Sequence, residues 1–202
     1  MKHIVTIQHT QSQHHVNGMV GSWTDWPLTD LGLAQADAIG KKLAAELGSC
    51  RPALYSSDLL RAKQTAEQIA RQLGATPILR QGLRERNLGR CCGKSVQWLR
   101  ENLECQENTI DDRLFSDGES RRDAWNRLRP FFQEIMDDSQ KTILLVSHGD
   151  LLGLFHAMFL GMDVESLNSR QLSGPAGGVS HLTVKEDGRR QVWRIGDLSY
   201  LT

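Results

Sequence analysis

The stretch "KTILLVSHGDLLGLFHAMFLG", residues 141–161, decides the fold class. Its first seven residues are the most strand-like run in the chain, and residues 149–161 are apolar enough for a buried helix. A buried strand that leads directly into a buried helix is typical of α/β proteins. The polar residue between the two elements is His148, which therefore lies at the carboxyl end of a strand.

Strands and helices also alternate upstream of this stretch, and a hairpin is predicted downstream, with its turn at Asp187-Gly188. The pattern predicts an α/β fold of three layers, α/β/α, with a mostly parallel central sheet, in a single domain spanning residues 1–202. The predicted strands are residues 3–7, 52–57, 76–80, 141–147, 178–187 and 189–197, and the predicted helices are 28–48, 57–74, 96–104, 120–138 and 149–161.

Cap residues and prolines set the expected limits of the helices. Ser57 is the expected N-cap of the helix 57–74, Gly74 is its stop, and Pro130 predicts a kink or irregularity in the helix 120–138. The helix 28–48 is expected to begin at Thr29 or Asp30 and to end before Gly48. Its predicted apolar face consists of Leu31, Ala38, Ile39, Leu43 and Leu47.

The composition is that of an ordinary globular protein. Of the 202 residues, 39% are apolar and 24% are charged, and the formal net charge is zero. A neutral chain has no global field to attract nucleic acid or an anionic membrane, so neither is an expected partner. No run approaches the roughly 18 apolar residues that a membrane span requires.

The cysteines indicate a reducing compartment. Cys50, Cys91, Cys92 and Cys105 form no CxxC pair, and the first residues do not have the pattern of a secretory signal. We therefore expect reduced thiols and a cytoplasmic location. The vicinal pair Cys91-Cys92 allows a redox role, but the favoured explanation is that the two cysteines are neighbours by chance.

Reactive side chains follow several of the predicted strands. His9 follows the first strand, Arg61 lies just beyond the second, Glu85 follows the third, and His148 follows the strand 141–147. The carboxyl ends of parallel strands meet at one edge of a sheet, so these residues are expected to converge. A neutral imidazole is a nucleophile toward phosphorus, a guanidinium matches phosphate oxygens, and a carboxylic acid can protonate a leaving alkoxide. The set predicts phosphoryl transfer.

The same segments resemble the histidine phosphatase superfamily, also called phosphoglycerate-mutase-like. The resemblance rests on five matches in the expected order: "PLTDLGLAQA", "LYSSDLLRAKQTAEQIA", "LRERNLGRCCG", "DGES" and "LLVSHGD". It implies that His9 is the phosphorylated nucleophile, that Arg61 and His148 bind the phosphoryl group, and that Glu85 is the acid and base. It also implies that no metal or organic cofactor is needed.

The first signature of that family is altered here. Arg-His-Gly is expected, and the chain has Gln8-His9-Thr10, while His15 stands where an asparagine is expected. Losing an arginine contact costs about 1.5–3 kcal/mol, or roughly 10- to 150-fold in rate. A protonated His15 would restore part of the lost charge. The residues expected to bind the substrate are Gln8, Gln11, Ser12, His15 and Gly149.

Several polar and aromatic residues have an ordinary structural interpretation. Arg61 can be a surface residue, His148 can cap the next helix, and the charges of "LRER" around Glu85 can form a solvated face. His156 and His181 are expected to be packed residues. Trp23 and Trp26 either line the cleft or pack the loop "GMVGSWTDW", and Trp98 lies in a region that could present a partner surface.

The adjacent His14 and His15 suggest a metal site, with His3 and His9 close by in the sequence. Adjacent side chains rarely point at one ion, however, and no cysteine or carboxylate spacing supports zinc, so no metal is expected.

The sequence therefore predicts a metal-independent phosphoric monoester hydrolase that acts on a small phosphorylated metabolite through a phosphohistidine at His9. The alternative, which Gln8 allows, is a weakly active or inactive protein that binds a phosphorylated ligand and has a regulatory role. A phosphoglycerate mutase is less favoured, because the segment between Glu85 and Glu119 is short for a closing lid. A homodimer is compatible with the sequence.

Overall fold

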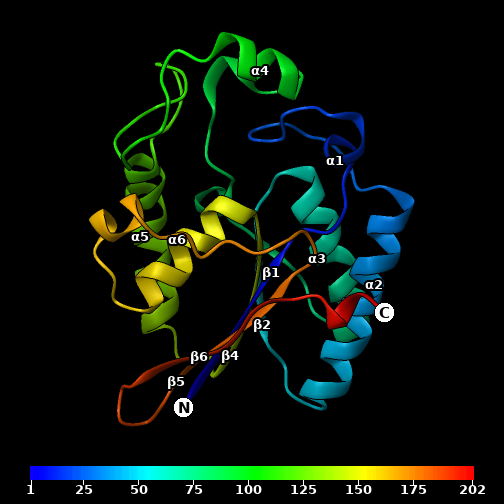
Figure 1. Cartoon of the computed structure of the whole chain (residues 1–202). Helices are drawn as coiled ribbons and strands as arrows, with labels where there is room; N and C mark the ends of the chain where they lie inside the picture. The colour runs from blue at the N-terminus through cyan, green and yellow to red at the C-terminus, as the bar shows by residue number, and fades with distance from the viewer.

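A computed structural model describes residues 1–202 as one six-stranded sheet between two layers of helices (Figure 1). The strand order is β3-β2-β4-β1-β5-β6; the first four strands are parallel to one another, and β5 is antiparallel to both of its neighbours. The predicted three-layer α/β fold is confirmed. The strands are β1 (Lys2–Gln8), β2 (Ala53–Ser56), β3 (Ile78–Leu79), β4 (Thr142–Ser147), β5 (Val179–Val184) and β6 (Arg190–Asp197).

Helices α2 and α3 cover one face of the sheet, and α5 and α6 cover the other (Figure 1). The short helices α1 and α4 lie beyond the carboxyl ends of the parallel strands. No helix is both long enough and apolar enough to cross a bilayer. The helices are α1 (Gln13–Asn17), α2 (Asp30–Leu47), α3 (Leu60–Leu73), α4 (Val96–Asn102), α5 (Arg121–Asp137) and α6 (Gly149–Phe159).

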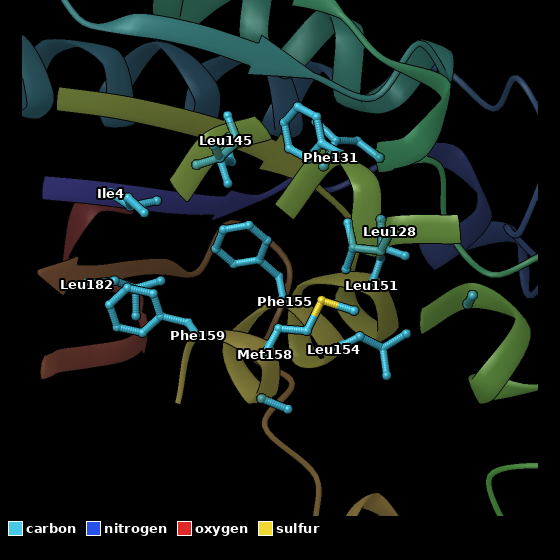
Figure 2. Close-up of a cluster of buried hydrophobic side chains, with 14 of the residues drawn as sticks. Ile4, Leu128, Phe131, Leu145, Leu151, Leu154, Phe155, Met158, Phe159 and Leu182 are labelled. Carbon is cyan, nitrogen blue, oxygen red and sulfur yellow. The ribbon is translucent and has the colours of Figure 1, made fainter. Parts of the chain in front are cut away.

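The larger core lies between α6, α5 and the sheet. Phe155 and Phe159 point from α6 toward Ile4 of β1, Leu145 of β4 and Leu182 of β5 (Figure 2), and all five are at most 1% exposed. Burying each of these side chains stabilises the fold by about 1.5–3 kcal/mol. The core fixes α6 against β4, and so fixes the position of the strand-to-helix junction at which His148 lies.

The apolar face of α2 differs from the predicted one. Leu31 is 54% exposed, and the buried positions include Gly32 and Gly40. A Cβ on Gly32 would lie 1.9 Å from the carbonyl oxygen of Gln11, and one on Gly40 would lie 3.0 Å from Cα of Ile69 in α3. Because the backbone approaches its neighbours closely at these two glycines, the helix turns Leu31 outward. A prediction that places the large apolar residues on the buried face could not anticipate this.

Two details of the helices also differ from expectation. Helix α3 has Leu59 at its N-cap, so the prediction that Ser57 caps it is wrong. The Ser57 hydroxyl instead contacts His148. Helix α5 continues past Pro130 without interruption, and the carbonyl left without a donor belongs to Asn126, which is exposed to water.

Candidate active site

The register of the two central strands brings the predicted histidines together. In the parallel pair β1–β4, Gln8 lies opposite Ser147, and the amide N of His9 donates to the carbonyl of Ser147 at 2.9 Å. His9 and His148 therefore leave the sheet at the same edge. Their ring centroids are 5.1 Å apart, with the rings arranged edge to face.

The hydrogen bonds of His9 define which nitrogen can react. Nδ1 lies 2.9 Å from the carbonyl oxygen of Thr10, and a carbonyl only accepts, so we assign the proton to Nδ1. Nε2 then carries the lone pair and accepts from Nε of Arg61 at 3.1 Å. Burial and the charge of Arg61 hold the pKa of His9 well below its usual value. The ring is neutral at pH 7, with its nucleophilic nitrogen directed at the guanidinium.

Arg61 is a buried residue, which excludes the surface interpretation. It is 1% exposed, and its Nη1 and Nη2 each donate at 2.8 Å, to the carbonyls of Thr24 and Ser22 respectively. Ser22 itself has a left-handed φ of 43°, which is unusual for a residue with a side chain. Burial lowers the pKa of Arg61 to about 10, so the group stays charged at neutral pH.

The Glu85 carboxylate lies at the first turn of α6. It accepts hydrogen bonds from the amides of Arg86, Asp150 and Leu151 at 2.9–3.3 Å. Burial, assisted by the negative charge of Asp150, raises the pKa of Glu85 to about 7. A carboxyl group with that pKa can donate and accept a proton near neutral pH.

His148 is held on one side only. Its Nε2 lies 2.9 Å from Oγ of Ser57, and its Nδ1 is buried without a partner. Oγ of Ser57 accepts from the amide of Leu59 and has no acceptor for its own proton other than Nε2 of His148, so we assign that proton to the bond with His148. Nδ1 is then the protonated nitrogen, a donor with no acceptor in the protein.

A cavity of about 320 Å³ opens above His9, Arg61 and Glu85, while His148 is fully buried beside His9 and does not itself line the cavity. Among the residues expected to bind the substrate, Gln8, His15 and Gly149 line this cavity, together with His9, Arg61 and Glu85. Gln11 and Ser12 do not line it. Oε1 of Gln11 accepts from Oγ1 of Thr29 at 2.7 Å, and Ser12 is fully buried.

The altered signature residues have different surroundings. Thr10 faces away from the cavity: its Oγ1 donates to the carbonyl of Gly32 at 2.7 Å, and its amide donates to Oγ1 of Thr65. Gln8 faces the cavity, and its Oε1 is buried without a partner. Thr10 therefore ties the loop to α2 and α3, and of the two residues beside His9 only Gln8 changes the chemistry of the wall.

Among the residues of the cavity wall that sequence reasoning missed, Arg86 and His14 bear the strongest polar groups. Arg86 was grouped with a solvated face, yet it is 4% exposed and pairs with Glu107 and Asp150. Its buried Nε has no partner. His14, the second missed residue, hydrogen-bonds through Nδ1 to Oγ of Ser12. Arg86 directly follows Glu85 in the sequence, and this was the signal that could have placed it at the site.

His15 does not supply the charge that was expected of it. Its Nδ1 accepts from the amide of Ser12 at 3.2 Å, and burial and Arg61 lower its pKa. The ring is therefore neutral at pH 7, with its proton on Nε2.

The geometric reason for excluding a metal also fails, because one nitrogen from each of His9, His14 and His15 can be chosen so that all three lie within 4.8 Å of one another.

The remaining candidates are structural. His156 is 2% exposed and bonds to Oγ1 of Thr6, and His181 contacts His3 and Tyr200 away from the cavity, as expected.

Trp23 does not line the cavity; its Nε1 donates to the carbonyl of Glu85 at 2.6 Å. Trp26, likewise outside the wall, bonds to the carbonyl of Val20. Both tryptophans pack the loop, one of the two expected alternatives, and the four cysteines are free thiols.

The strand order and the pair of histidines at the strand ends define an α/β protein with its site at the carboxyl edge of a parallel sheet. The chain belongs to the histidine phosphatase superfamily (branch 1), whose family model matches residues 4–196.

Curated relatives include two kinds of named mutase. The chain is 30% identical over 180 residues to a 2,3-bisphosphoglycerate-dependent phosphoglycerate mutase of Bartonella tribocorum, covering 84% of this chain and 87% of the relative. It is 32% identical over 168 residues to the probable phosphoglycerate mutase GpmB of Escherichia coli, covering 80% and 76%.

Solved structures with the same fold include named phosphatases. YhfR of Bacillus stearothermophilus superposes with a TM-score of 0.84 at 26% identity, covering 100% of both chains. A mycobacterial glucosyl-3-phosphoglycerate phosphatase has a TM-score of 0.83 at 23% identity, covering 97% of this chain and 99% of that one. A protein described as a putative alpha-ribazole-5'-P phosphatase of Escherichia coli has a TM-score of 0.82 at 20% identity, covering 98% and 97%.

Proposed function

We propose that the protein is a phosphatase that hydrolyses a small phosphomonoester through a phosphohistidine at His9, without a metal. One observation carries the proposal: the lone pair of His9 Nε2 and the Glu85 carboxyl, with its pKa of about 7, belong to the same cavity. A nucleophile and an acid with matched protonation states are what a two-step phosphoryl transfer requires.

In the first step, Nε2 of His9 attacks phosphorus, the P–N bond forms, and the bond to the leaving oxygen breaks. Protonated Glu85 gives its proton to that oxygen. In the second step, ionised Glu85 takes a proton from water, the water oxygen bonds to phosphorus, and the P–N bond breaks. Arg61 and Nδ1 of His148 donate to the phosphoryl oxygens in both steps, which stabilises the developing charge.

The wall of the cavity supports a small polar substrate. Only Val20 and Leu88 contribute apolar side chains among the fifteen residues that line it. A compact, polar phosphorylated metabolite fits this lining better than a long apolar one. The named phosphatases of the same fold are consistent with phosphomonoester chemistry, and the substrates in their names belong to those proteins.

The test is an assay of purified protein with p-nitrophenyl phosphate and a panel of sugar and glycolytic phosphates, in metal-free buffer at several pH values. We expect turnover, and we expect ³²P on His9 when the reaction is quenched without acid. His9→Ala is expected to remove both. Absence of turnover and of label, together with binding of the phosphate esters, would instead indicate a binding protein.

A mutase is tested in the same experiment. With 3-phosphoglycerate and 2,3-bisphosphoglycerate present, a mutase converts the 3-phosphate to the 2-phosphate and releases little inorganic phosphate. We expect inorganic phosphate from at least one ester and no such conversion. Isomerisation faster than hydrolysis would overturn the assignment as a phosphatase while keeping His9 as the nucleophile.

A further inference from the structure

Three imidazoles lie close together in the wall of the cavity. The ring centroids of His14 and His15 are 4.0 Å apart, and they lie 5.7 and 5.4 Å from the centroid of His9. Each ring offers a nitrogen that lies within 4.8 Å of the other two. The rings come from two sources: His9 follows β1, and the other two belong to the one-turn helix α1.

Ser12 explains why two adjacent side chains point the same way. Its amide donates to Nδ1 of His15 at 3.2 Å, a capping bond at the start of α1, and its hydroxyl bonds to Nδ1 of His14. One buried residue thus holds both rings, and Nε2 of His14 lies 2.9 Å from where a Cβ on Gly21 would be. Ser12 therefore brings the two rings together before any ligand arrives, and His15, which is exposed, has room to adjust.

The donor set has the chemistry of a transition-metal site. Zinc binds imidazole nitrogens at 2.0–2.1 Å in a tetrahedron, which separates the ligand atoms by about 3.4 Å. From a separation of at most 4.8 Å, each ring needs to move by only about 1 Å. Three neutral nitrogens without a ligating carboxylate suit Zn²⁺, Ni²⁺ or Cu²⁺ and do not suit Mg²⁺ or Ca²⁺.

The substitution at Gln8 favours a cation in the cavity. The cavity has one guanidinium fewer than the resemblance leads one to expect, so it repels a dication less.

Two existing contacts oppose the metal and make its binding reversible. Nε2 of His9 must leave Nε of Arg61, whose charge repels the ion. Coordination through Nε2 of His15 moves its proton to Nδ1, and the amide of Ser12 then loses its acceptor, at a cost of about 1 kcal/mol. Bound metal occupies the lone pair of His9, the same pair that the proposed reaction uses.

We propose that His9, His14 and His15 form a reversible binding site for a transition-metal ion, with Zn²⁺ the best fit, and that occupancy of this site inhibits the enzyme. The inhibition rests on the proposed phosphatase function, whereas the binding does not. The metal competes with the phosphomonoester, because both need Nε2 of His9.

The binding test uses full-length protein without a histidine tag, stripped of metal and titrated with Co²⁺ and then Zn²⁺. We expect one equivalent of Co²⁺ to give the strong visible absorption of a four- or five-coordinate ion, and Zn²⁺ to displace it. His14→Ala and the more conservative His14→Gln are expected to weaken binding at least tenfold. His181→Asn, which removes a histidine of the pair His3–His181, is the matched control and is expected to leave the titration unchanged.

The inhibition test follows p-nitrophenyl phosphate hydrolysis while Zn²⁺ is added. We expect inhibition that raises KM, leaves kcat unchanged and is reversed by EDTA. Binding that survives both His14 variants, or that is lost in His181→Asn, would overturn the site. A cobalt spectrum that depends on His14 in a protein without phosphatase activity would keep the site and reject the proposed function, so the two failures are distinguishable.

Discussion

His9 and His148 leave neighbouring parallel strands at equivalent positions, yet the protein holds the two rings in opposite ways. Nδ1 of His9 is fixed by a carbonyl, and its Nε2 presents a lone pair to Arg61. Nε2 of His148 is fixed by the hydroxyl of Ser57, and its Nδ1 has no partner. The strand end sets where a side chain lies, and the group that binds the far side of the ring sets whether it acts as a nucleophile or as a donor.

The largest expected effect separates these two roles. His9→Ala removes the atom that bonds to phosphorus, so we expect turnover to fall by about four orders of magnitude or more. His148→Ala removes one hydrogen bond to a charged group, which is about 1.5–3 kcal/mol, or roughly 10- to 150-fold. Steady-state kinetics with p-nitrophenyl phosphate measure both. Equal losses in the two variants would contradict the division of roles.

The second prediction concerns Glu85 and the leaving group. An alkoxide needs a proton to leave, and p-nitrophenolate does not. Glu85→Gln is therefore expected to slow the formation of phosphohistidine from an alkyl phosphate by about 10²- to 10⁴-fold, and from p-nitrophenyl phosphate far less. Rapid-quench measurement of phosphohistidine formation tests this prediction. Glu104→Gln, at an exposed carboxylate, is the matched control.

The same carboxyl predicts a pH dependence. Because the pKa of Glu85 is raised to about 7, the protonated acid is lost above that pH. Phosphohistidine formation from alkyl phosphates should then fall about tenfold per pH unit in alkaline buffer. A flat profile to pH 9 would show that another group supplies the proton.

The fourth prediction tests the altered strand end. Gln8→Arg places a guanidinium beside Gly149, where the amide of Gln8 now packs and its Oε1 lacks a partner. We expect kcat/KM to rise about tenfold, because a charged donor replaces a neutral one. Gln8→Met, of similar length, removes the amide and should lower activity slightly. A fall in Gln8→Arg would mean that Gln8 is a feature selected for the particular substrate.

The fold was predictable from the sequence because each strand and helix carries its own pattern. The strand 141–147 and the helix after it needed no long-range information, and the four strand-end residues followed from the rule that parallel strands end at one edge. The exposure of Leu31 was not predictable, since it depends on how closely Gly32 approaches Gln11. That distance is set by tertiary packing.

The failures within the site have a related cause. Ser57 has the local signature of a helix cap, and a partner 91 positions away, His148, takes its hydroxyl. His14 and His15 were expected to diverge, as adjacent residues usually do, and Ser12 holds both rings together. In each case a hydrogen bond from one buried serine overrides a local preference, and nothing in the spacing of residues reveals such a bond.

The smallest expected effect is on the stability of the fold. His9 and His148 should contribute equally to the pH dependence of the free energy of unfolding. Burial lowers the pKa of His9 and of His148, so between the folded value and about 6.5 the unfolded chain binds more protons and stability falls as pH falls. From pH 6.5 to 5.5 each ring should cost the folded state about 1 kcal/mol. Urea unfolding at the two pH values should show that His9→Gln and His148→Gln each lose about that much of the pH dependence. If only one variant does so, the pKa of the other ring is not depressed in the folded protein, and for His9 this would contradict the buried neutral nucleophile on which the proposed reaction depends.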